Sequence, residues 1–403
     1  MTKAAAALCL AVVLALLLAP QLVASPPVDL PALLRIAGKL TGITPKTKVH
    51  VVVDSPTALK TQIVKVLDRD YPREQQTYDQ TLYQALGLLG AKQALRSYLV
   101  SAVTYGVLGV YDPVTQRLYV RRGIGERRAL LHELVHALQD QAFNLRRLSS
   151  LRRGSRDAAL AASAIVEGHA LLATSALGGH ALAAHEPKRA LAAGCNICFF
   201  LQLEQQFPSA TGFRFASTLY SLGGRSAVFT ALRTFPTTTE QIFHIDKYLT
   251  REPAQTISLP QAVGDFSLAR SDTFGELDVR ALLAVFQVPR LDKVGDGWGG
   301  GRSGLYQAAD GRSAFAVALS WDTVYDAAQW EEAVTTYVNE AFEPDIPGFP
   351  PTTPCGVDTC WNVAGRMIAF ARRGTSSALV FGPTIPAAEV VADAVVGQGS
   401  TSG

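Results

Sequence analysis

The chain has little net charge. Lysine and arginine together number 37 and aspartate and glutamate 34, which leaves a formal net charge of only +3. A surplus this small does not favour nucleic acid as a partner, because nucleic-acid binding depends on concentrated positive charge. One arginine cluster is the exception, and we expect it either to meet acidic or anionic groups of a partner or to lie on a solvated loop. The cluster consists of Arg146, Arg147, Arg152, Arg153 and Arg156.

Long hydrophobic runs are also scarce. The one marked run covers residues 4–19, directly follows Met1-Thr-Lys, and is too short for a comfortable membrane span. It predicts a secretory signal over residues 1–25, with cleavage near Ala24 or Ser25. The alternative is an uncleaved membrane anchor formed by residues 4–19. No later segment has the roughly 18 apolar residues of a membrane helix, so we expect a secreted, periplasmic or cell-envelope protein.

Cysteine is limited to five residues, and one of them, Cys9, lies in the apolar run. Four cysteines remain if the signal is removed, and an even number in an exported chain favours disulfides. Of the three possible connectivities we expect the two local pairs, and the alternative is a structural zinc held by four thiolates. The remaining cysteines are Cys195, Cys198, Cys355 and Cys360.

Histidine is rare too, with seven residues, yet two of them form the most informative motif of the chain. His132 and His136 belong to an HExxH sequence, and on a helix this spacing places both imidazoles on nearly the same face. Such a pair can bind one Zn²⁺. Glu133 would lie beside the metal and take a proton from the zinc-bound water as general base.

The surroundings of the motif favour a helix with one packed face. Leu131, Leu134 and Leu138 form an apolar stripe beside the polar stripe of His132, His136 and Asp140. The alternative is a solvated helix whose histidines and aspartate face water. Asp140 is either an acceptor for the second N–H of a ligand imidazole or an ordinary surface charge.

A catalytic zinc keeps three protein ligands, so the third must come from elsewhere. The metzincin motif is absent because Gln139 and Ala142 stand where it needs glycine and histidine. A second predicted helix, beginning near Ser155 or Asp157, carries Glu167 and the alternative ligand His169. These two side chains point about 200° apart, so one helix cannot easily give both to one metal. We favour Glu167, and we expect Gly168 and the many alanines to let this helix approach the HExxH helix closely.

Two further features of the sequence would contribute to substrate binding and catalysis. Residues 106–121 read as two strands joined at Asp112-Pro113, and an edge strand beside the zinc could bind an extended peptide. The alternative is a hairpin that only covers the helix. An oxyanion at zinc also needs a donor opposite the metal. The candidate donors, each of which could instead be structural or solvated, are His180, His185, His244 and Tyr248.

Several motifs together resemble a group of exported bacterial gluzincin-type zinc metallopeptidases. They are Tyr111-Asp-Pro, the run from His132 to Gln141, Val166-Glu-Gly, Phe207-Pro, the segment from Thr239 to Tyr248, Gly297-Trp-Gly-Gly and Trp321-Asp-Thr. The resemblance extends from about residue 45 to near the C-terminus. It implies zinc held by His132, His136 and Glu167, with Glu133 as base. The chain departs from the group at His169 and Gly301, where the group has aspartate.

The predicted fold class is α+β. After a leader segment (26–46) we expect a mostly helical, zincin-like domain with an edge hairpin (47–292) and a smaller ββαββα domain (293–403). In the second domain, Asp310-Gly311 predicts a hairpin, and Trp298 either packs or forms a stacking platform. The predicted helices are 55–69, 75–90, 92–103, 187–206, 211–221, 224–233, 237–249, 324–342 and one from Ala387; the predicted C-terminal strands are 303–309, 313–320, 361–371 and 376–381.

These patterns predict an exported zinc metallopeptidase acting on a protein or peptide substrate. The alternative is a cell-envelope binding or scaffolding protein that contains zinc but does not turn over substrate. The intact Glu133 argues against that alternative, because a protein without catalysis has no physical need for the base.

Overall fold

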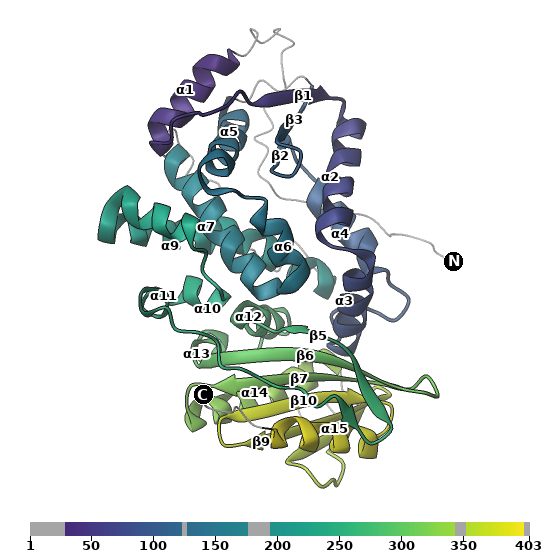
Figure 1. Cartoon of the computed structure of the whole chain (residues 1–403). Helices are drawn as coiled ribbons and strands as arrows, with labels where there is room; N and C mark the ends of the chain where they lie inside the picture. The colour runs from purple at the N-terminus through teal and green to yellow at the C-terminus, as the bar shows by residue number, and fades with distance from the viewer. Residues whose placement is uncertain (1–28, 123–126, 176–193, 343–351, 399–403) are drawn as a thin grey trace. The chain divides into compact units, whose positions relative to one another are not determined.

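The computed structural model describes residues 29–122, 127–175, 194–342 and 352–398 (Figure 1). It has a mixed α+β fold, as the sequence predicts. The chain divides into two compact units: the first comprises residues up to 73, 95–153 and 159–236, and the second 74–94, 154–158 and 237–403. The predicted signal and two of the candidate donors, His180 and His185, lie outside the described residues.

The first unit contains a small three-stranded sheet with strand order β1-β3-β2. Strand β3 (Arg117–Arg121) is parallel to β1 (His50–Asp54) and antiparallel to β2 (Gly109–Asp112), so the predicted hairpin is confirmed. Helix α2 (Pro56–Asp70) buries Leu59 and Ile63 against Tyr119 of this sheet. Strand β2 forms one edge, and its neighbour along the chain is helix α4 (Leu95–Thr104).

Helices make up the rest of the first unit. Helix α1 (Leu30–Thr41) lies in the predicted leader, begins at an Asp29 cap and packs on α5 (Arg127–Phe143). Helix α6 (Arg147–Gly154) carries most of the arginine cluster, so the prediction of a loop there is wrong. Two of its arginines are bound within the unit, since Arg147 lies over the ring of Phe235 and Arg152 pairs with Asp70.

Two longer helices, α7 (Arg156–Thr174) and α9 (Asn196–Arg233), cross at a pair of glycines. A Cβ on Gly168 would lie 2.0 Å from the carbonyl oxygen of Gly212. The close approach expected at Gly168 is therefore made to α9, and not to the HExxH helix. The separate helices predicted at 211–221 and 224–233 belong to α9, which contains Pro208 and is kinked at Gly223 and Gly224.

The second unit is built on a seven-stranded antiparallel sheet with the order β4-β5-β6-β7-β10-β9-β8. The strands are β4 (Ala262–Val263), β5 (Phe266–Thr273), β6 (Trp298–Ala308), β7 (Ser313–Trp321), β8 (Thr359–Val363), β9 (Arg366–Arg373) and β10 (Ser376–Gly382). The predicted turn at Asp310-Gly311 joins β6 to β7. The predicted strand 361–371 is divided into β8 and β9, because Ala364 and Gly365 adopt positive φ angles and form a turn. Strands β4 and β5 were not predicted.

Helices cover both faces of this sheet. Alternate side chains of a strand point to opposite faces, and on β7 Ala316 packs in the cluster that includes Val391 of α15 (Ile385–Gly397), while Phe315 contacts Tyr78 of α3 (Arg73–Ala85). Helix α14 (Val324–Phe342) has the predicted bounds. The shorter helices are α10 (Thr239–Phe243), α11 (Ile245–Thr250), α12 (Glu276–Val285) and α13 (Leu291–Asp296).

Trp298 is buried in the second unit. Its side chain is 2% exposed and its indole N–H donates to the carbonyl oxygen of Phe274. The alternative of a stacking platform is therefore wrong. All four tryptophans of the chain lie in this unit, and all are among its fully buried side chains.

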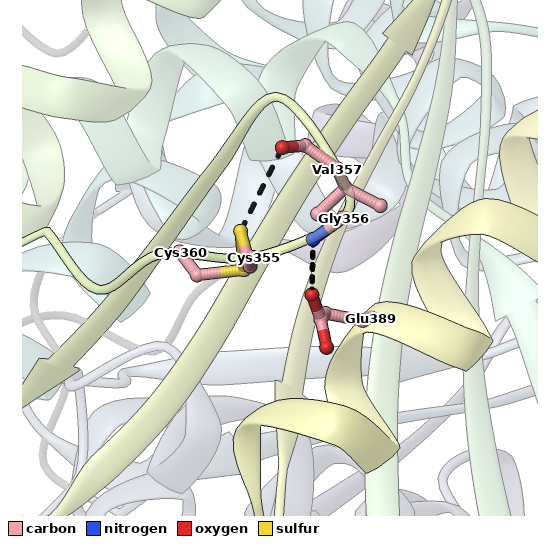
Figure 2. Close-up of a disulfide and its surroundings, with 5 residues drawn as sticks. All are labelled: Cys355, Gly356, Val357, Cys360 and Glu389. Atoms are coloured by element: carbon pink, nitrogen blue, oxygen red, sulfur yellow. Dashed lines mark hydrogen bonds between the residues drawn. A yellow bond between two sulfur atoms is a disulfide. The ribbon is translucent and has the colours of Figure 1, made fainter.

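Both predicted local disulfides are present, Cys195–Cys198 and Cys355–Cys360. The second closes a short loop before β8 (Figure 2). In the same loop the backbone N–H of Gly356 donates to the carboxylate of Glu389 on α15. Among the described residues, no helix combines the length and the apolar character needed to cross a membrane.

Candidate metal centre

Helix α5 places the two motif histidines in contact. Leu131, Leu134 and Leu138 are buried, so the apolar stripe packs as its periodicity predicts. On the neighbouring face, Nε2 of His132 and Nε2 of His136 lie 3.0 Å apart. His136 is buried, which rules out the alternative of a solvated helix whose polar stripe faces water.

Helix α7 brings Glu167 to the same point. One carboxylate oxygen of Glu167 lies 3.2 Å from Nε2 of His132 and the other 3.4 Å from Nε2 of His136. A tetrahedral zinc with bonds of roughly 2.0–2.1 Å separates its ligand atoms by about 3.3 Å. The spacing of the three donors therefore fits a zinc ion, and no side chain would have to move far to bind it.

The electrostatics of the three groups favour a cation. Burial lowers the pKa of His136, but the carboxylates of Glu167 and Glu133 and the contact with Gln139 more than offset burial and raise the pKa to about 9. Burial on its own would raise the pKa of Glu167, but the two histidines outweigh burial and hold this pKa well below its usual range. The carboxylate is thus ionised and stabilises positive charge between the three side chains.

Glu133 stands apart from these three donors. Its Oε2 accepts a hydrogen bond of 2.8 Å from the backbone N–H of Tyr111 on edge strand β2. A Cβ on Gly109 would lie 3.4 Å from Cγ of Glu133. The carboxylate of Glu133 is thus held by the backbone of the strand edge and is not one of the three donors that face one another.

Asp140 is buried, so the alternative of a surface charge is wrong. Its two oxygens accept from the hydroxyl of Tyr111 at 2.9 Å and from the backbone N–H of Leu145 at 2.8 Å. Asp140 thus links the motif helix to strand β2 through Tyr111. The partner of the His136 imidazole is a different residue.

That partner is Gln139, which the sequence reasoning missed. Its Oε1 lies 2.8 Å from Nδ1 of His136, and its Nε2 lies 2.9 Å from the carbonyl oxygen of Val166 and 2.8 Å from Nδ1 of His169. The spacing of three residues from His136 to Gln139 places both on one helix face and is a signal that could have identified it. His169 therefore contacts Gln139, and Glu167 alone of the two alternatives meets the histidine pair.

His244 and Tyr248 belong to the second unit. His244 lies 3.1 Å from Glu276 and, with Asp296, forms another group with metal-binding spacing. Arg280 pairs with both carboxylates, however, and already supplies the positive charge there. Tyr248 is buried beneath Arg251. The role of His244 and Tyr248 as oxyanion donors stays a prediction.

A pocket of about 260 Å³ adjoins Glu133. Gly109 and Glu133 form part of its wall, and the rest is largely apolar. The apolar side chains include Val51, Val53, Val120 and Leu130.

The comparison with protein families gives a match within the second unit. A family model described as a domain of unknown function (DUF8575) matches residues 264–392. This range runs from the start of β5 into α15 and does not include the candidate metal centre. No curated protein and no solved structure matches the chain.

Proposed function

We propose that the protein is an exported zinc metallopeptidase whose metal is held by His132, His136 and Glu167. The observation that carries the proposal is the convergence of three ligand atoms, within 4.8 Å of one another, beside a separate carboxylate. Three protein ligands and an open fourth position are typical of catalytic zinc, whereas structural zinc is usually closed by four ligands.

When bound, zinc would act as a Lewis acid and lower the pKa of a water molecule towards 7. Glu133 would act as general base and take the proton from that water. The N–H of Tyr111 would orient the Glu133 carboxylate and leave its second oxygen available for the proton.

Substrate would bind as an extended chain. Strand β2 is an edge strand, and such an edge can pair with a peptide through main-chain hydrogen bonds, which give affinity without sequence specificity. The pocket beside Glu133 would accept an apolar side chain. Export is supported by the predicted signal over residues 1–25 and by the two disulfides, which persist in oxidising compartments.

The test compares residues 26–403 with the Glu133→Gln variant. We expect about one bound zinc in both proteins, and loss of casein cleavage by roughly 10²- to 10⁴-fold in the variant, which is the usual contribution of general acid–base catalysis. Glu332→Gln, at an exposed position of α14, is the control and should cleave as the unmodified protein does. Equal cleavage by Glu133→Gln would end the proposal. Zinc without any cleavage by the unmodified protein would favour the non-catalytic alternative.

A further inference from the structure

A buried row of polar side chains lies behind the candidate metal centre and has no part in the proposed proton transfer. Gln139 is 0% exposed and His169 4% exposed. An amide and an imidazole buried this deeply are costly unless their polar atoms are paired. The pairing that the structure gives them is specific in direction.

The direction follows from Val166. A backbone carbonyl oxygen can only accept, so the amide nitrogen of Gln139 must face it and the amide oxygen must face His136. That oxygen can only accept as well. The hydrogen between them therefore belongs to Nδ1 of His136, so Nε2, the atom that faces Glu167, is the nitrogen that can release its proton and bind a metal.

The second N–H of the Gln139 amide points to Nδ1 of His169 at 2.8 Å. The amide nitrogen can only donate, so Nδ1 of His169 accepts this hydrogen bond and carries no hydrogen of its own. Both donors of the amide are thus used, and turning the amide round would set its oxygen against the carbonyl oxygen of Val166.

Gln139 also bridges the two helices that supply the ligands. It lies on α5 with His136, and its partners Val166 and His169 lie on α7, on either side of Glu167. One amide thus contacts an imidazole ligand directly and holds the backbone immediately before the carboxylate ligand.

We propose that Gln139 is a positioning residue for the zinc centre: it fixes the tautomer of His136, sets the spacing between His136 and Glu167, and is itself oriented by His169. The proposal rests on the proposed zinc site. Its chemical basis is general, because the outer partner of a metal-bound histidine orients the ring and raises its basicity.

The test measures the zinc dissociation constant of residues 26–403 by competition with a chromophoric chelator. We expect Gln139→Leu to weaken zinc binding about 10- to 100-fold, as loss of such partners typically does. Gln141→Leu is the matched control. Gln141 is on the same helix and bonds Lys46 and Thr47, away from the ligands, so this variant should bind zinc normally. Gln139→Met, which keeps the length of the side chain without its polar atoms, serves if Gln139→Leu does not fold.

A second measurement separates positioning from general destabilisation. We expect His169→Phe to weaken zinc binding less than Gln139→Leu does, and the double variant to bind zinc no more weakly than Gln139→Leu alone, because the effect of His169 passes through Gln139. In ¹⁵N spectra of ring-labelled protein, Nδ1 of His136 should carry the hydrogen in the unmodified protein.

Three results would overturn the proposal. They are unchanged zinc affinity in a folded Gln139 variant, equal weakening in Gln141→Leu, and an Nδ1 of His136 that carries no hydrogen. Failure of the unmodified protein to bind zinc would instead overturn the proposed function. Zinc binding without hydrolysis would leave this test intact, since its readout is affinity.

Discussion

At the scale of single residues, Asp157 shows how a buried carboxylate is used structurally in this fold. One of its oxygens accepts 2.6 Å from the hydroxyl of Thr239, and a Cβ on Gly275 would lie 1.9 Å from the same oxygen. Burial raises the pKa of Asp157 to about 7, although its hydrogen bonds from Thr239 act in the opposite direction. The residue joins the first turn of α7 to the starts of α10 and α12 within the second unit.

This pKa has a consequence for stability. A carboxyl group that binds its proton more tightly when folded stabilises the fold fully below its unfolded pKa, near 3.8, and loses that contribution as the pH rises through about 7. We expect the free energy of unfolding to fall between pH 4 and 7, by up to about 1.4 kcal/mol per pH unit from this group. Urea unfolding followed by tryptophan fluorescence measures it.

Asp157→Asn is the reference for this prediction, because it cannot titrate. The slope of stability against pH should be shallower in the variant over the same window. Glu240, whose pKa burial also raises to about 7, contributes a slope of the same sign to both proteins and cancels in the comparison. Equal slopes would contradict the prediction.

At the scale of elements, the crossing of α7 and α9 supports the ligand Glu167. The two helices touch through backbone atoms, because a Cβ on Gly212 would lie 2.2 Å from the carbonyl oxygen of Ala164. Gly168 follows Glu167 directly. A side chain added at the crossing would therefore move the segment that carries the carboxylate ligand.

We predict that Gly168→Ala lowers the free energy of unfolding by about 1–3 kcal/mol, the usual cost of overpacking, and also weakens zinc binding. Thermal or urea unfolding monitored by far-UV circular dichroism measures the first effect and chelator competition the second. Gly154→Ala at the end of α6 is the control, since an added Cβ there meets nothing within 4 Å. Wild-type stability in Gly168→Ala would show that the helices can separate freely.

Elements were predictable where local pattern and packing agree. The bounds of α14 and the hairpin at Asp310-Gly311 follow from periodicity and turn chemistry alone. Helix α9 was not predictable as one element, because Pro208 and the glycines lower local helix propensity and only tertiary packing overrides them. Tertiary packing also explains why strand β6 begins within a glycine run, where local propensity is low. A Cβ on Gly301 would lie 2.1 Å from the carbonyl oxygen of Phe274, so only glycine allows this close approach.

The candidate site divides in the same way. His132, Glu133 and His136 are identifiable because a fixed spacing on one helix determines their common face. Glu167 follows from ligand chemistry and an apolar surround. Gln139 follows only in part: its spacing from His136 places both on one helix face, but its contact with the carbonyl of Val166 is specified by no sequence pattern.

At the scale of the whole molecule, the two units are interleaved along the chain, since residues 74–94 and 154–158 belong with the C-terminal sheet. Order along the sequence gives no sign of this, because the interleaved segments are joined by contacts between distant residues, such as the bond from Tyr337 to the carbonyl of Leu86. The Cys355–Cys360 disulfide lies in the second unit and closes a short loop beside α15 (Figure 2).

We predict that replacing both Cys355 and Cys360 by serine lowers the free energy of unfolding by about 2 kcal/mol, the loop-entropy value for so short a loop. Trp361 adjoins the disulfide and is buried, so tryptophan fluorescence follows the transition that the disulfide affects. Dithiothreitol should shift the unmodified protein towards the double variant. Coincident unfolding curves for the unmodified protein and the variant would contradict the prediction.

The confinement of every indole to the second unit has a practical consequence. Tryptophan fluorescence therefore reports on the large sheet and its covering helices. The unit that holds His132, His136 and Glu167 contributes no tryptophan signal of its own. An unchanged tryptophan emission during a zinc titration therefore does not show whether the ion has bound. Loading must be judged from a coloured chelator or from the metal itself.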